Sequence, residues 1–522
     1  MNTAIKMKTL NLSLEDILGS TYISQVCKAK AFLEQRPVED YLQIARTKVD
    51  FYPDELHKSL NDMIPLIGKQ VIETGITAET TMNGSSTDAF TESFKSEKTP
   101  LSNKGFYRLT ESGQIQAITK SEHYHAPLGH CFPGYKLLSY AQELGISNIA
   151  HNNTRGFITR LLEEKLVLLA NGKFDEGIKG FEAIQKNNDP HSMKRVINLQ
   201  TGSLAVEAAV KMMLARFYVS DPGMNQIPKY QGKIPVFIVI RDFEGGKQAN
   251  YHGTTILTQT LRDLWPGLYK KFEQAEAYLV KSIDINDIST FSDILTKYDA
   301  GKYKVAGFLH ELVLMNYGGF KISKQFLQDI YTICREHDIP TLVDEIQSCL
   351  WAPDLFLFRE YDLQPDFVSV GKGFPGGQYA ASKIVLTEEM DNLNQFGALV
   401  TNGQEELASL AYLITITFAY ENRRNTMEIG DYYFKSLQDL AVRFPKIIKK
   451  IEGDRHLASL VFGSAETAGN FAKKVTTKGY DISAQTYKAD CPPAALTKIP
   501  LISTKELIDA FIGCMESVLK EQ

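Results

Sequence analysis

The chain has 522 residues and a mass of 58.6 kDa, which is long enough for roughly two or three domains. Its 57 lysines and arginines nearly balance 62 aspartates and glutamates, for a formal net charge of −5 without long single-sign blocks, so we predict no nucleic-acid partner. The N-terminus lacks a secretory pattern and no apolar run reaches membrane-spanning length, so we expect a cytoplasmic protein without membrane contact. The six cysteines show no CxxC spacing, so we expect neither disulfides nor a metal site.

The first hundred residues divide into a helical part and a polar part. Ser13 and Asp16 form a capping-box pattern that predicts a helix start, and helix-like apolar spacing recurs from there to about residue 73. In the segment 74–103, threonine, serine, glycine and acidic residues dominate, which is typical of a linker or surface loop. We therefore expect a helical N-terminal extension with a polar linker over residues 1–103.

Short β-branched runs alternate with helical stretches between about residues 196 and 383. This alternation is typical of a mostly parallel sheet with helices on both faces, and such sheets bind ligands beyond the carboxyl ends of their strands. Residues 321–338 have the apolar spacing of a helix between two of these runs. The predicted strands are IPVFIVI (234–240), VAGFLHELVL (305–314), IPTLVDEI (339–346) and PDFVSVG (365–371).

A second, smaller α+β unit is expected after about residue 403. The run LASLAYLITITFAY (407–420) predicts a helix, and HLASLVF (456–462) predicts a short strand.

Asp344 stands at the end of the predicted strand IPTLV. A carboxylate that ends a buried parallel strand is costly to desolvate unless a cation meets it. A protonated pyridine nitrogen would be such a cation, and an aspartate there keeps a pyridine cofactor an effective electron sink. The alternative from this position alone is an aspartate that caps the next loop.

Lys372 lies between two glycines at the end of the run PDFVSV. Lysine forms Schiff bases with carbonyl cofactors, although most lysines are solvated surface charges. The same stretch, Gly371-x-Gly373-x-x-Gly376, also matches a dinucleotide fingerprint. That fingerprint requires a helix directly after it, whereas here a strand-like run, AASKIVL, follows, so a nicotinamide cofactor is disfavoured.

Two further motifs suit a planar, phosphorylated ligand. Gly202 and Ser203 open an alanine-rich, helix-forming segment, and backbone N–H groups at a helix start bind phosphate, although Ser203 is equally suited to simple N-capping. Tyr251 lies in a polar loop after the run IPVFIVI, where its ring can lie flat on a planar cofactor.

Together and in this order, these motifs resemble those of the class III aminotransferases, which belong to the fold type I enzymes that use pyridoxal phosphate (PLP). The resemblance covers about residue 105 to the C-terminus. It is carried by Thr201-Gly202-Ser203 with the helix that follows, Tyr251-His252-Gly253, Asp344-Glu-Ile-Gln347, Gly371-Lys372-Gly373-x-x-Gly376-Gly377, Gly129-His130-Cys-Phe-Pro133, Glu311 and Val400-Thr401-Asn402-Gly403.

The resemblance implies an α/β fold of the fold type I PLP-dependent transferases, with a mostly parallel seven-stranded sheet in a large domain, a small α+β domain and the helical N-terminal extension. It places the N-terminal part of the small domain at residues 104–150. The large PLP-binding domain follows at 151–403, and the C-terminal small α+β domain at 404–522.

The resemblance also implies roles for single residues. Lys372 holds PLP as an aldimine and moves protons, and Asp344 pairs with the pyridine nitrogen, so these two are the catalytic residues. Because the family builds its sites across a two-fold interface, a homodimer with shared active sites is implied. The implied PLP-binding set is Gly202, Ser203 and the neighbouring subunit's Thr401 at the phosphate, Tyr251 and Ile346 on the two faces of the ring, Gln347 near the ring oxygen, and His252, Glu311, Asp344 and Lys372.

The implied activity is transamination of a primary amine or amino acid, but two substrate features of the family are missing. Its second glutamate falls on Asn316, and the segment 492–500, where its arginine usually lies, contains none. A guanidinium is the natural clamp for an α-carboxylate, so ordinary 2-oxoglutarate-linked transamination is less favoured. The residues that fall near the family's substrate-facing positions are His123, Tyr124 and Arg155.

Two alternatives stay open at this point. The same scaffold supports PLP-dependent lyases, decarboxylases, racemases and aminomutases. The unexplained first hundred residues also allow a non-catalytic PLP-binding partner protein.

Overall fold

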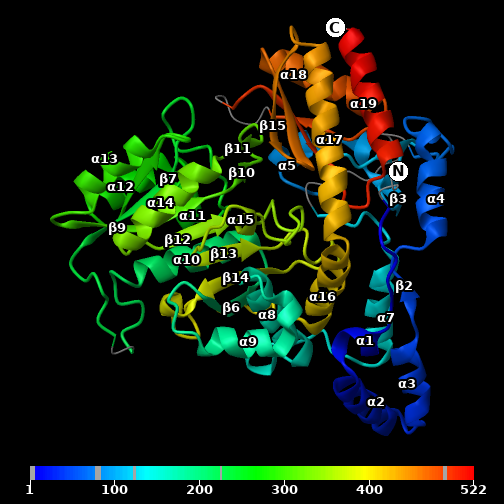
Figure 1. Ribbon diagram of the computed structural model, residues 1–522, viewed down its shortest axis with the longest axis horizontal. Coiled ribbons are helices and arrows are strands. Elements are labelled where there is room, and N and C mark those ends of the chain that lie inside the picture. The colour runs from blue at the N-terminus through cyan, green and yellow to red at the C-terminus, as the bar shows by residue number, and fades with distance from the viewer. Residues whose placement is uncertain (1–5, 77–83, 121–124, 224–225, 486–490, 522) are drawn as a thin grey trace.

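The computed structural model describes residues 6–76, 84–120, 125–223, 226–485 and 491–521. A seven-stranded mixed sheet forms the centre of its larger part (Figure 1). From β13 to β8 every neighbouring pair is parallel, whereas β14 runs antiparallel to both β13 and β6. In spatial order the strands are β6 (Met193–Leu199), β14 (Ser382–Thr387), β13 (Phe367–Val370), β12 (Thr341–Asp344), β9 (Tyr303–His310), β7 (Ile234–Ile240) and β8 (Leu279–Ile283).

Both faces of the sheet are covered, which is why its strands are apolar throughout. All seven residues of β7 are buried. Phe237 and Val239 pack with one group of helices, while Ile238 and Ile240 pack with the other, as the alternation of side chains along a strand requires. The first group is α10 (Gly202–Leu214), α11 (Ile256–Thr260) and α12 (Pro266–Gln274), and the second is α8 (Phe157–Ala170), α13 (Ile288–Tyr298) and α14 (Lys324–Glu336).

The predicted strands and the predicted helix at 321–338 all occur, with one difference. The run 305–314 splits into β9 and a two-residue strand, β10 (Val313–Leu314), which leaves the main sheet to pair with β11 (Phe320–Lys321). The chain leaves the sheet after His310, so that Glu311 lies at the strand end. Strand β14 follows the glycine-rich segment at 371–377, so the helix that a dinucleotide fingerprint requires is not there.

A four-stranded antiparallel sheet lies next to the long helix α17 (Arg423–Arg443) (Figure 1). Its strand order is β15-β16-β18-β17, and β16 falls on the predicted strand HLASLVF. The elements of this part are α16 (Glu406–Glu421), α17 (Arg423–Arg443), β15 (Ile448–Asp454), β16 (Leu457–Phe462), α18 (Ala465–Thr477), β17 (Ser483–Ala484), β18 (Ala494–Lys498) and α19 (Lys505–Lys520).

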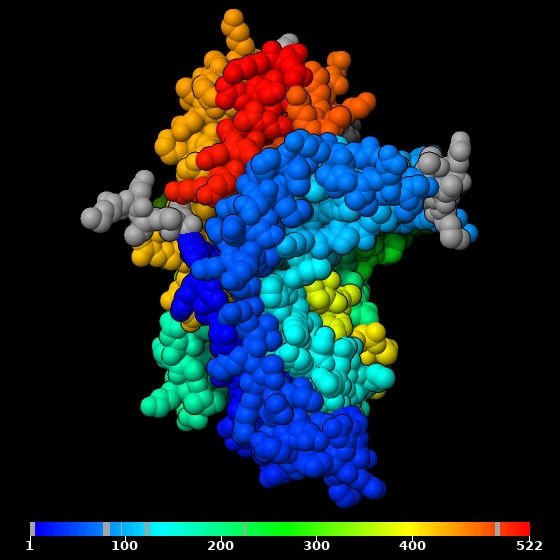
Figure 2. All heavy atoms as spheres, turned by 90° about the vertical axis from the view of Figure 1, so that its right-hand side faces the viewer, coloured from blue at the N-terminus to red at the C-terminus, as the bar shows by residue number. Residues whose placement is uncertain are grey.

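The N-terminal residues run along one side of the molecule (Figure 2). The predicted capping box is present, because the Ser13 hydroxyl accepts the Asp16 N–H at 3.2 Å and the Asp16 carboxylate accepts the Ser13 N–H at 2.7 Å. Within the predicted polar linker the described residues include α5 (Asp88–Ser93) and the strand β3 (Pro100–Lys104). The other α-helices and strands of the described residues are β1 (Asn11–Leu12), α1 (Leu14–Leu18), α2 (Ser20–Glu34), α3 (Val38–Arg46), β2 (Val49–Asp50), α4 (Asp54–Asp62), β4 (Tyr107–Thr110), β5 (Ile115–Ala117), α7 (Lys136–Glu143), α9 (Gly177–Lys186) and α15 (Leu357–Glu360).

All six cysteines have free thiols. None of the helices in the described part of the chain has both the length and the apolar character needed to cross a membrane. The domain limits given above stay a prediction.

A buried ion pair joins the three-stranded sheet β3-β4-β5 to the C-terminal sheet. Asp481 is 8% exposed and pairs with Arg108 at 3.0 Å and with Lys98. Its backbone N–H also donates to the Ala117 carbonyl at 2.9 Å. Burial acts to raise the pKa of Asp481, but the nearby cations Arg108, Lys98 and Lys120 outweigh it and hold the pKa below its usual value.

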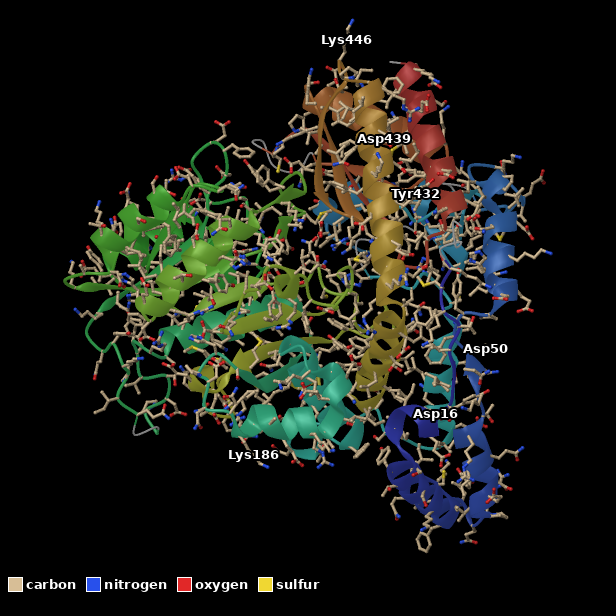
Figure 3. The ribbon with its side chains drawn as sticks, viewed as in Figure 1. Asp16, Asp50, Lys186, Tyr432, Asp439 and Lys446 are labelled. Atoms are coloured by element: carbon tan, nitrogen blue, oxygen red, sulfur yellow. The ribbon has the colours of Figure 1, made fainter. Side chains whose placement is uncertain are left out.

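Replacing Asp481 with asparagine should lower the free energy of unfolding by about 3–5 kcal/mol, because the buried Arg108 then loses the carboxylate that pairs with its guanidinium. Urea denaturation at neutral pH measures the change. Since the folded-state pKa is depressed, the contribution of Asp481 is present above its unfolded-state pKa and is lost as the pH falls through its folded-state value. Asp439→Asn is the control, because Asp439 lies on α17 in an exposed pair with Lys435 (Figure 3) and should change stability little. Equal losses in the two variants would contradict the prediction.

Candidate active site

A cavity of about 410 Å³ lies beyond the carboxyl ends of the parallel strands. This is the position where such sheets bind ligands. Every residue that the sequence predicted to bind the cofactor lines it, except Thr401. The lining residues are His125, Gln200, Thr201, Gly202, Ser203, Tyr251, His252, Gly253, Glu311, Asp344, Ile346, Gln347, Lys372, Pro375, Gly377, Gln378, Tyr379, Ala380, Ala381 and Ser382.

Asp344 ends β12 and keeps a charged carboxylate in the wall of the cavity. It accepts hydrogen bonds from the Ser369 hydroxyl at 2.6 Å and the Ile346 N–H at 3.1 Å, and Nδ1 of His252 lies 3.3 Å from its second oxygen. Burial acts to raise the pKa of Asp344, but the contacts with His252, Ser369 and Ile346 outweigh it, and the pKa lies below its usual value. The carboxylate is therefore charged and suited to a cationic partner.

Lys372 lies in the turn after β13, with a positive φ of 36°. Burial lowers the pKa of its amine, although the carboxylates of Asp344 and Glu311 act in the opposite direction. A lowered pKa makes more of the neutral amine available, which is the form that attacks carbonyl groups and accepts protons.

The start of α10 forms a tight corner with the loop after β7. The Thr254 N–H donates to the Ser203 hydroxyl at 3.1 Å. Gly253 has a φ of 114°, and a β-carbon there would lie 2.7 Å from Cα of Ser203, so only glycine fits. A β-carbon on Gly202 would likewise lie 2.8 Å from Cδ1 of Ile346. These contacts bring the N–H groups of a helix start to the cavity, where they suit an anion such as phosphate.

Two buried polar atoms of the cavity residues have no hydrogen-bond partner among the described residues. They are Nε2 of His252 and Oε1 of Gln347. Leaving a buried polar group unpaired costs about 1–3 kcal/mol. Their presence in the same cavity indicates that a polar ligand belongs there.

Tyr251 and Glu311 are fixed by contacts around the loop after β7. Oε1 of Glu311 accepts the Tyr251 N–H at 3.1 Å. The guanidinium of Arg262 lies 4.8 Å from the centre of the Tyr251 ring and donates to the Tyr251 carbonyl at 3.0 Å. The tyrosine is therefore held beside the cavity, while its proposed stacking on a cofactor ring stays a prediction.

Two sequence-predicted residues, Thr401 and Arg155, do not line this cavity. Thr401 is exposed in the loop before α16. Arg155 forms an ion pair with Glu163 at 3.0 Å and lines a separate cavity of about 230 Å³ that includes Val400. His123 and Tyr124 lie outside the described residues.

Several residues that line the cavity were not predicted from the sequence. His125 directly follows the predicted substrate residues, and Gln378 and Tyr379 follow the glycines after Lys372, so proximity to motifs was the available signal. Gln200 directly follows β6, two residues before the predicted helix start at Gly202. None of the four matches a motif of its own.

Comparisons with known proteins identify a family for this chain. The sequence model of the family described as aminotransferase class-III matches residues 119–519. An acetylornithine aminotransferase from Methanocaldococcus jannaschii is 24% identical over 402 residues, which span 74% of this chain and 90% of that protein. An adenosylmethionine-8-amino-7-oxononanoate aminotransferase from Buchnera aphidicola is 26% identical over 200 residues, spanning 36% of this chain and 42% of that protein.

Solved structures share the fold. A transaminase from the marine bacterium Virgibacillus has a TM-score of 0.65 at 14% identity, and the match covers 89% of this chain and 98% of that chain. The ornithine aminotransferase of Toxoplasma gondii ME49 has a TM-score of 0.64 at 18% identity, covering 81% of this chain and 90% of that one. At such identities the likeness establishes the fold, and the predicted fold type I architecture is thereby confirmed.

The environment of Lys372 predicts a pH dependence that can be measured on the protein without cofactor. The rate at which its amine reacts with an acylating reagent should rise with pH, and the midpoint of this rise should lie below the ordinary lysine pKa of about 10.4. Replacing Asp344 with asparagine should move the midpoint further down, because it removes a carboxylate that stabilises the ammonium form. Peptide mass spectrometry follows the reaction, with the exposed Lys186 (Figure 3) as the reference amine. An upward shift in the variant would contradict this account of the site.

Proposed function

The chain belongs to the class III aminotransferase family, and we propose that Lys372 and Asp344 form its PLP site. We also propose that its amino donor is a primary amine or amino acid. The chain is a PLP-dependent aminotransferase. One observation carries the assignment of the site: a charged buried carboxylate and a lysine of lowered pKa line the same cavity.

The residues of the cavity fit PLP. Asp344 would bind the protonated pyridine nitrogen, and the N–H groups at the start of α10, at Gly202 and Ser203, would bind the phosphate. The amide of Gln347 would lie near the ring oxygen, which gives its buried side chain a polar neighbour. Lys372 would hold the cofactor through its amine.

When bound, PLP supplies an electron sink that stabilises negative charge on a substrate carbon. The rest of the chemistry falls to the protein. Burial lowers the pKa of Lys372, so its neutral amine can take a proton from that carbon and return it as the ammonium. The hydrogen-bonded carboxylate of Asp344 keeps its charge throughout, because three contacts hold it in the ionised form.

The residues that line the cavity indicate how a substrate carboxylate could be bound. No arginine occurs among the described residues that line it. A substrate carboxylate would therefore be bound without a bidentate guanidinium from these residues. We propose His123 and Tyr124 as substrate contacts, because they directly precede His125, which lines the cavity. Arg155 lies in a different cavity and would reach a substrate only in a neighbouring subunit's site.

The proposed quaternary structure is a homodimer in which Thr401 binds the phosphate of the partner subunit's cofactor. Two exposed apolar side chains, Ile149 and Phe396, lie in the loops next to it. The Gln395 amide donates to the Asn153 side-chain oxygen at 2.8 Å and links these two loops. Exposed apolar groups of this kind are typical of an interface. We also propose a cytoplasmic location, which the six free cysteines support.

Replacing Lys372 with alanine should lower the rate of amino transfer by about 10²- to 10⁴-fold, because the proton-transfer group is lost. It should also abolish the PLP-labelled peptide that borohydride reduction of the wild type produces. Spectrophotometric assays with a panel of primary amines and amino acids measure the first effect, and mass spectrometry measures the second. Lys194→Ala serves as the control, because Lys194 is also buried but lies at the start of β6 in an ion pair with Glu388. A labelled peptide in the Lys372 variant, or no transfer by the wild type from any donor, would contradict the proposal.

Subunit mixing tests the proposed role of Thr401. Thr401→Ala and Lys372→Ala homodimers should each be impaired in both sites. A heterodimer of the two variants should contain one intact site, because the Thr401→Ala subunit supplies Lys372 and its partner supplies the threonine. Transaminase activity of purified, differently tagged heterodimers measures this recovery. If Thr401 serves its own subunit, no activity will return.

A further inference from the structure

Lys498 ends β18 with a side chain that is completely buried. It is the one cation in the sequence segment 492–500. Its ammonium donates to the main-chain carbonyl of Gln347, and its nitrogen lies 3.6 Å from the centre of the Trp351 ring. The lysine therefore extends from the C-terminal sheet to the loop that follows Asp344.

The contact between these two parts is reciprocal. While Lys498 binds the loop, the indole N–H of Trp351 donates back to the carbonyl of Ile499 at 3.1 Å. The main chain of Lys498 is itself fixed, because its N–H donates to the Thr119 carbonyl at 2.8 Å. The main-chain position from which the Lys498 side chain extends is therefore fixed.

Burying a lysine is costly, so its contacts must compensate. Lysines are almost never fully buried without a partner, and burial lowers the pKa of Lys498. The Gln347 carbonyl and the face of Trp351 both stabilise its ammonium form. An apolar residue would fill the same space without this cost, so the lysine is suited to a specific contact rather than to packing.

The other anchors of the loop do not hold Gln347. The carboxylate of Glu345 accepts the Ser348 hydroxyl at 2.6 Å and the Phe358 N–H at 2.6 Å, which fixes the residues on either side. Oε1 of Gln347 has no hydrogen-bond partner among the described residues. Lys498 is the side chain that binds the main chain at this position.

We propose that Lys498 is a positioning residue that fixes the main chain at Gln347 from the C-terminal sheet and so directs the Gln347 amide into the PLP cavity. The inference rests on the proposed contact between Gln347 and the cofactor ring oxygen. It means that the C-terminal sheet, whose residues do not line the cavity within the described chain, sets part of the cofactor environment.

Lys498→Met, which keeps the length of the side chain but removes the donor, tests this on the full-length protein. We expect about a tenfold rise in the Kd for PLP, measured by titrating the cofactor-free protein, and a shifted absorption maximum of the bound cofactor. The matched control is Lys304→Met. Lys304 is also buried, and its amine donates to the His337 carbonyl. It lies at the start of β9, whereas the cavity lies at the other end of this strand, next to Glu311. The control should leave the Kd and the absorption maximum unchanged even if it lowers thermal stability.

A double-mutant cycle asks whether Lys498 acts through Gln347. If it does, adding Lys498→Met to Gln347→Ala should change neither the Kd nor the absorption maximum beyond the Gln347→Ala values. Independent, multiplicative effects would overturn the proposal. If Lys498→Met does not fold, the cycle is run with Lys498→Arg, which keeps the charge but moves the donor atoms. Its effects must likewise vanish in Gln347→Ala.

The outcomes separate this inference from the proposed function. A wild-type protein that binds no PLP would contradict the proposed function. A wild-type protein that binds PLP, together with a Lys498→Met variant of unchanged Kd and spectrum, would overturn the role of Lys498 alone.

Discussion

The structure of the site depends on keeping one carboxylate charged inside the protein. Asp344 stands at the end of a buried strand, where desolvation favours the neutral acid. Donors from three separate segments, at His252, Ser369 and Ile346, reverse that preference. A charge stabilised in this way attracts a cation, and in a PLP enzyme the protonated ring nitrogen is that cation.

The main chain around the carboxylate is arranged so that a planar ligand can approach it. Gly202 lets the start of α10 come close to Ile346, and Gly253 lets the loop after β7 close on Ser203. The loop after Asp344 is in turn fixed from the C-terminal sheet through Lys498 and Trp351. Residues at the strand ends of the seven-stranded sheet line the cavity, while residues of the C-terminal sheet fix one of its loops from outside.

Much of this could be predicted from the sequence, because buried parallel strands read as apolar runs and the motifs at their ends carry unusual residue types. The run IPVFIVI became β7, and Asp344 and Lys372 met in the same cavity. The Lys498 contact could not be predicted, because it joins residues 151 positions apart in the sequence and Lys498 belongs to no motif. The same holds for Asp481, whose partner Arg108 lies in a distant strand. Arg155 forms an ion pair with Glu163 and lines another cavity, a placement that its position in the sequence does not indicate.

We propose that the charge of Asp344 keeps the cofactor ring nitrogen protonated. Nitrogen-15 magnetic resonance of the protein reconstituted with PLP labelled at the ring nitrogen measures this directly. The account predicts the chemical shift of a protonated pyridine in the wild type and of an unprotonated one in Asp344→Asn. An unprotonated nitrogen in the wild type, or a protonated one in both proteins, would contradict it.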